Sequence, residues 1–195
     1  MDKNKALEDL AFVKNIIEES NQSVIFGRGF IVWGVLIAIS LIATYTMIKT
    51  QTYSYISWWW CIVIGGGWLY EAINWKKSVK RDQPRTFIDK IIGKVWLAMG
   101  ISASIIGISG MFFTNFGMHI SALISLVLAV AYLTTGELLK KTYWRYFAGG
   151  WWAVSIVMLL WPGVHTTLIM AGAMVAFQIV PGIIIQKKIN FEPQD

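Results

Sequence analysis

Charged side chains are scarce in this chain of 195 residues, and their scarcity excludes most soluble folds. Asp, Glu, Lys and Arg make up 14% of the residues, whereas hydrophobic side chains make up 56%. An ordinary soluble domain has a charged share of about a quarter. The composition therefore predicts a protein that lies in a membrane.

Cysteine is nearly absent, and the motifs of common enzymes are missing. Cys61 is the single cysteine, so no disulfide can form within the chain. The sequence has no HExxH, GxSxG, CxxC or P-loop pattern, and the glycines in GGGW at 65–68 follow no predicted strand, as a phosphate-binding loop would require. The sequence thus predicts a protein without a cofactor or metal site that is not an enzyme. The basic linker at 76–92 has few aromatic residues and does not predict nucleic-acid binding.

What the chain does contain is long apolar runs. Six of them are long enough to cross a hydrocarbon layer of about 30 Å as helices. The tight linkers TNFGM and WPGVH predict antiparallel neighbours, and the eleven Trp suit helix ends at headgroup level. The predicted fold is an all-α integral membrane protein with six transmembrane helices arranged as three antiparallel hairpins. We place the helices near residues 29–48, 56–75, 93–115, 118–138, 144–162 and 164–186.

The basic residues predict the orientation of these helices. Of the seventeen Lys and Arg, Lys49 alone falls on one side of the predicted membrane domain. Because Lys and Arg are enriched in cytoplasmic loops, both termini are predicted to be cytoplasmic. The predicted domains are an N-terminal segment at 1–27, the transmembrane domain at 28–188 and a cytoplasmic tail at 189–195.

The N-terminal segment has the periodicity of an amphipathic helix over residues 6–26. Leu10, Val13 and Ile17 belong to its apolar stripe, while acidic and basic residues occupy the polar positions. Such a helix needs a partner, which could be lipid, the protein's own cytoplasmic surface or another protein. We take Leu10, Val13 and Ile17 as candidate partner-binding residues, for a second protein or for self-association.

The hairpins also resemble one another in sequence. Each outgoing helix carries an early Trp, and each returning helix ends with a small residue followed by a Lys pair. The returning segments are WLYEAINWKK, YLTTGELLKK and QIVPGIIIQKK. The pattern favours three related two-helix units, although membrane helix ends that share Trp and Lys anchors would produce a similar pattern.

Two carboxylates and one arginine form a candidate polar pocket. Glu71 and Glu137 lie near predicted cytoplasmic helix ends, where nearby Lys residues can compensate their negative charge. Lys140 and Lys141 follow Glu137 at three and four residues, the spacing that places side chains on one helix face. This favours carboxylates at the membrane interface over catalytic groups inside the membrane. In the alternative, Glu71, Glu137 and Arg145 converge at the inner ends of their helices as structural ion pairs or as a binding site.

A second candidate site lies in the last helix. Pro181 lacks a backbone N–H and therefore leaves the carbonyl of Phe177 without its helical donor. The side-chain amide of Gln178 lies three residues before this proline. Broken helices with polar groups mark substrate sites in transporters. Gln178 and Pro181 are therefore a candidate kink site, with simple helix bending as the competing interpretation.

In outline the chain resembles the small six-helix bacterial inner-membrane proteins of the HdeD type. The resemblance covers roughly residues 29–186 and rests on segments such as GVLIAIS, GISGMFF and PGVHTTLIMAGAMVAF. It implies three successive helix pairs and a multi-pass protein of the bacterial inner membrane, and it implies no site residues. The first hypothesis for function is a non-enzymatic scaffold or regulatory partner that acts through its cytoplasmic face. The alternatives are a small transporter or channel that uses the kinked sixth helix, and an intramembrane enzyme that uses Glu71 or Glu137.

Overall fold

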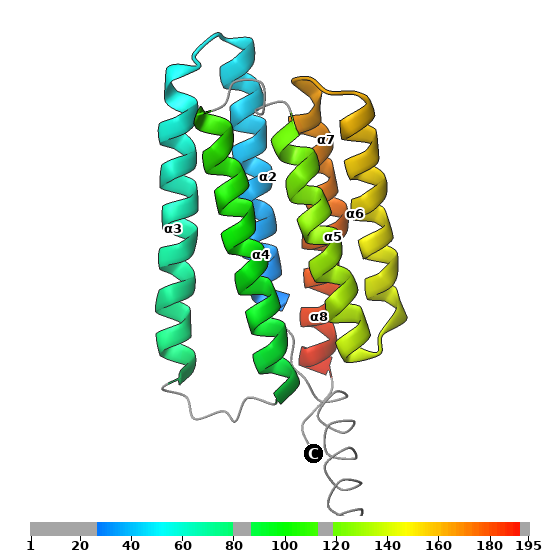
Figure 1. Ribbon diagram of the computed structural model, residues 1–195. Coiled ribbons are helices and arrows are strands. Elements are labelled where there is room, and N and C mark those ends of the chain that lie inside the picture. Colours follow the sequence, from blue (N-terminus) through cyan, green and yellow to red (C-terminus); the bar gives the residue numbers. More distant parts are fainter. Residues whose placement is uncertain (1–26, 80–86, 113–118, 192–195) are drawn as a thin grey trace, which may run out of the picture.

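The computed structural model describes residues 27–79, 87–112 and 119–191, and every regular element in these ranges is helical. The long helices lie side by side, and the chain reverses direction from each to the next (Figure 1). Their positions match the six predicted stretches, except that the second helix ends later and the third begins earlier than predicted. The elements are α2 Gly27–Lys49, α3 Ser54–Val79, α4 Phe87–Phe112, α5 Ile120–Leu139, α6 Thr142–Leu160, and a last rod made of α7 His165–Met174, η2 Val175–Ile179 and α8 Val180–Phe191.

Four of the described helices are long and apolar enough to cross a membrane: Gly29–Lys49, Phe87–Gly110, Ile120–Leu139 and His165–Gln186. The other two, α3 and α6, are rich in Trp, with five of the eleven Trp in α3 and three in α6. Indole rings carry a polar N–H and favour the membrane interface. Their abundance therefore lowers the mean hydropathy of α3 and α6, although both helices lie beside apolar neighbours. Six membrane crossings are thus not confirmed by length and composition alone.

The helices differ in how much of their surface the bundle covers. α5 packs most extensively against α6, and α2 packs along α7 and α8. By contrast, α3 lies at the edge of the bundle, and Val63 and Gly67 are its buried residues among those whose side chains are described. The sequence predicted pairing within hairpins, but the closest packing joins α5 of one predicted hairpin to α6 of the next.

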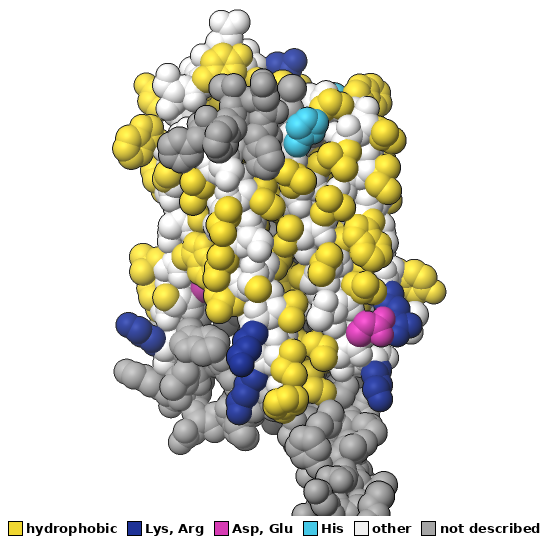
Figure 2. Space-filling model, in the orientation of Figure 1, with side chains coloured by type: hydrophobic (Ala, Val, Ile, Leu, Met, Phe, Trp, Pro, Cys, Tyr) yellow, Lys and Arg dark blue, Asp and Glu magenta, His cyan; other side chains and the backbone are white. Residues whose placement is uncertain are grey.

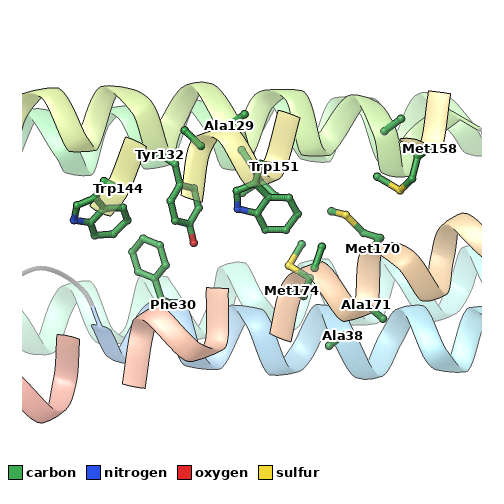
Figure 3. Packing of buried hydrophobic residues seen from close by; sticks show 14 of the residues in the cluster. Phe30, Ala38, Ala129, Tyr132, Trp144, Trp151, Met158, Met170, Ala171 and Met174 are labelled. Carbon is green, nitrogen blue, oxygen red and sulfur yellow. The ribbon is translucent and has the colours of Figure 1, made fainter. Parts of the chain in front are cut away.

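The core is built around Tyr132. Its ring has no exposed surface and lies 5.2 Å from Trp144, 5.3 Å from Trp96 and 5.7 Å from Phe30, measured between ring centroids. Several of these pairs are edge-to-face, the arrangement that the charge distribution of aromatic rings favours. Figure 3 shows Tyr132 between Trp144 and Trp151, with Phe30 opposite. These rings fill the interior of the half of the bundle that contains the α5–α6 turn.

The turn between α5 and α6 brings the two helices into close contact. Lys140 adopts a left-handed backbone conformation (φ 52°), and the N–H of Lys141 donates to the carbonyl of Gly136 at 3.2 Å. These bonds cap the end of α5. Gly136 also permits the approach of α6, because a Cβ at this position would lie 2.8 Å from the Cβ of Trp144.

Candidate functional site

Glu137 and Arg145 form an ion pair across the α5–α6 turn. Arg145 Nε lies 2.8 Å from Glu137 Oε1, and Arg145 Nη2 donates to Glu137 Oε2 at 2.9 Å. This bidentate geometry matches the planar guanidinium to the carboxylate. The side chains are 50% and 55% exposed for Arg145 and Glu137. The pair is therefore a surface contact that joins two helix ends rather than a closed pocket.

The predicted neighbours of Glu137 are not its partners in the structure. The spacing of Lys140 and Lys141 places them on the Glu137 face only if the helix continues past them. Helix α5 ends at Leu139, and the left-handed residue Lys140 redirects the chain. The turn instead returns Arg145 to Glu137 from the first turn of α6.

Glu71 lies on a different helix and has a different partner. The indole Nε1 of Trp33, on α2, donates to Glu71 Oε1 at 3.0 Å. The structure thus brings Glu137 and Arg145 together and places Glu71 with Trp33. The candidate pocket of three residues separates into an ion pair and an indole–carboxylate hydrogen bond.

The kink site has the geometry expected from its proline, with an addition. Around Gln178 the last helix widens into the π-helical turn Val175–Ile179, where the N–H of Val180 donates to the carbonyl of Val175. A proline ring clashes with the carbonyl four residues earlier, and a wider turn relieves that crowding. The freed carbonyl of Phe177 accepts a hydrogen bond from the hydroxyl of Tyr132 at 2.6 Å. The sequence indicated this acceptor but could not indicate its donor on α5.

Gln178 is buried, and its side-chain oxygen has no hydrogen-bond partner within the part of the chain that the structure describes. Burying a polar atom without a partner costs free energy, so such an atom points to strain or to a function. The surroundings are closed, since Pro181 is also buried and the ring of Phe177 packs against Trp151 at 5.8 Å. The kink therefore has an unpaired acceptor in a filled core.

A cavity in the described part of the bundle is lined by residues of α2 and α3. It is an apolar groove of about 490 Å³ between α2 and α3. Five aliphatic residues of α2 line it together with Ser40, and α3 contributes Trp59 and Val63. The α2 residues are Ile31, Val32, Val35, Leu36 and Ile39.

Two of the three predicted repeat units share an equivalent hydrogen bond. Trp33 Nε1 donates to Glu71, and Trp96 Nε1 donates to the hydroxyl of Thr135 at 3.1 Å. Glu71 and Thr135 occupy the same position in the aligned segments WLYE and YLTT, directly before the small residue. Pro181 occupies that position in the third unit and offers no side-chain acceptor. These two hydrogen-bonded pairs could have been predicted from the repeat. Each joins the recurring Trp of the outgoing helix to the residue directly before the small residue of the returning helix.

The candidate partner-binding residues Leu10, Val13 and Ile17 lie outside the described residues. Comparisons of the chain with protein-family models, with curated proteins and with solved structures found no match. The resemblance to HdeD-type proteins therefore stays a prediction, and the geometry of the bundle carries the functional argument.

Proposed function

We propose that this chain is a six-span protein of the bacterial inner membrane that acts as a non-enzymatic scaffold or regulatory partner through its cytoplasmic face. The distribution of described charges supports the orientation (Figure 2). Lys76, Lys90, Lys94 and the pair Lys140–Lys141 lie toward one end of the bundle, and Lys49 lies at the other. Basic residues concentrate on the cytoplasmic side of membrane proteins.

The topology is tested with reporter fusions. Fusions at residues 52 and 116 are expected to report an extracytoplasmic location, and fusions at residues 82, 142 and 195 a cytoplasmic one, because the basic residues set the orientation. A single reporter on the opposite side contradicts six crossings. In that case α3 or α6 is the helix to re-examine, because both are less apolar than the others.

The observation that supports a scaffold best is the filled interior. Tyr132, Trp144 and Trp151 have no exposed surface and occupy the space that a pathway between the helices would need. The Glu137–Arg145 ion pair lies at the helix ends that we propose to be cytoplasmic, and both of its side chains are about half exposed. A bundle with a closed core and a charged end presents its cytoplasmic face to partners.

The partner surface is predicted on residues 6–26 and is tested there. We expect Leu10→Asp with Ile17→Asp to leave the bundle inserted and folded but to remove co-purifying partners or self-association, because the apolar stripe is lost. The matched control is Asp9→Asn with Glu18→Gln, which changes two charges on the polar positions. Retention of every partner by the Leu10/Ile17 variant would contradict the scaffold proposal.

A second candidate function is transport at the kink of the last helix. The buried, unpaired oxygen of Gln178 beside the π-helical turn favours it. Flux of ions or small polar solutes into liposomes that contain the purified protein tests this candidate. Flux in the parent protein that is lost in Gln178→Leu would support transport. If the parent protein shows no flux, the scaffold remains the proposed function.

A further inference from the structure

The carboxylate of Glu71 has no cationic partner among the described residues. Its hydrogen bond comes from the neutral indole of Trp33, and no described Lys, Arg or His forms an ion pair with it. Lys76 follows five residues later, about 140° around the helix, and so points away from the Glu71 face. Glu137, in contrast, is neutralised by the guanidinium of Arg145, two of whose three nitrogens contact the carboxylate.

The hydrogen bond from Trp33 places this carboxylate beside the apolar span of α2. Trp33 lies four residues after the start of the apolar span Gly29–Lys49, which corresponds to about 6 Å of helix rise. An ionised carboxylate at such a level is unfavourable unless a cation or hydrogen-bond donors compensate it. One indole N–H supplies a single donor and no positive charge, so Glu71 retains the capacity to bind a cation.

The Trp33 ring that donates to Glu71 packs against a second indole, that of Trp68. The ring of Trp33 lies across Gly67, where a Cβ would come within 2.3 Å of it, and Trp68 stands edge-on to Trp33 at 6.4 Å between centroids. Trp68 is held in turn by a hydrogen bond from its Nε1 to the hydroxyl of Ser104 at 3.3 Å. Gly67 and Trp68 precede Glu71 by four and three residues, the spacings that place side chains on one face of a helix.

We propose that Glu71, Trp33 and Trp68 bind the positively charged group of a hydrophobic organic cation. The electron-rich faces of indole rings attract ammonium and phosphonium groups, and a carboxylate supplies the counter-charge. All three side chains are partly exposed, so a ligand can reach them. The shared chemistry is a cationic head on an apolar body, which a free lipophilic cation and the amine headgroup of a lipid both offer. This inference goes beyond the scaffold function and does not depend on residues 6–26.

The test is binding of tetraphenylphosphonium to the full-length protein in detergent micelles, measured by titration calorimetry and by quenching of Trp fluorescence. Uncharged triphenylphosphine oxide is the control probe. We expect Glu71→Gln to raise the Kd about tenfold to a hundredfold, because a charge-assisted contact is lost. Glu137→Gln is the matched carboxylate control and is expected to leave the Kd unchanged, whereas Glu71→Asp retains the charge and most of the affinity.

The ring contribution is tested separately with Trp68→Leu, which keeps the carboxylate and is expected to weaken binding severalfold. If Glu71→Gln does not fold, judged by gel filtration and circular dichroism, Trp68→Leu decides the proposal. An unchanged Kd in the folded variants, or equal binding of the neutral probe by the parent, overturns it. Competition by phosphatidylethanolamine but not phosphatidylglycerol identifies a lipid amine as occupant, and competition by neither identifies a free cation.

Discussion

Removing the hydroxyl of Tyr132 tests whether the kink of the last helix is stabilised from α5. The hydroxyl donates to the carbonyl of Phe177, which Pro181 leaves without a helical donor. The Tyr132 side chain is fully buried, and Phe177 is partly buried. Tyr132→Phe keeps the ring and its aromatic contacts, so the change isolates the hydrogen bond. Side-chain hydrogen bonds between membrane helices contribute about 0.6 kcal/mol on average and up to about 1.7.

Leaving this partly buried carbonyl unpaired adds to the loss, since a fully buried orphaned acceptor costs about 1–3 kcal/mol and a partly buried one costs less. We therefore expect Tyr132→Phe to lower the free energy of unfolding by about 1–2 kcal/mol. The assay is denaturant unfolding of the purified protein in mixed micelles, followed by circular dichroism. Tyr146→Phe is the matched control, because the Tyr146 side chain is 75% exposed and the same atom is removed at the surface.

A double-mutant cycle with Pro181 sharpens the test. Pro181→Ala restores a backbone N–H four residues after Phe177, so the carbonyl can be satisfied within its own helix. We expect Tyr132→Phe to cost about 1 kcal/mol less in the Pro181→Ala background, a coupling typical of residues that share a partner. Additive effects of the two substitutions would show that Tyr132 and Pro181 do not act on the same carbonyl, and the reasoning would fail.

Two further predictions concern the edges of the bundle. Gly67→Ala is expected to destabilise the protein by about 1–3 kcal/mol through overpacking against the Trp33 ring. Gly65→Ala, where a Cβ would meet open space, is its control, and equal thermal shifts in detergent would contradict the close approach. Arg145→Gln is expected to change the free energy of unfolding by no more than about 1 kcal/mol, because half-exposed ion pairs contribute little. A loss of several kcal/mol in the same denaturant assay would instead indicate that the pair is buried in the membrane-embedded protein.

The amino-acid sequence alone determined where the helices lie and that they are apolar. The six predicted stretches correspond to the described helices because long runs of hydrophobic residues must satisfy their backbone hydrogen bonds locally. The sequence also indicated that Pro181 frees the carbonyl of Phe177, since that consequence depends only on the missing N–H four residues later. Both inferences concern contacts within one segment of chain.

Only the tertiary structure decided which segments meet. Tyr132 reaches Phe177 from a position 45 residues earlier, and Trp33 reaches Glu71 from 38 residues earlier, contacts that no helical periodicity encodes. The prediction that Glu71, Glu137 and Arg145 could converge placed three residues at similar depth, but depth leaves the rotation and neighbours of each helix undetermined. Those depend on how large and small side chains interlock, as where Gly67 admits the ring of Trp33 and thereby brings the indole N–H to Glu71.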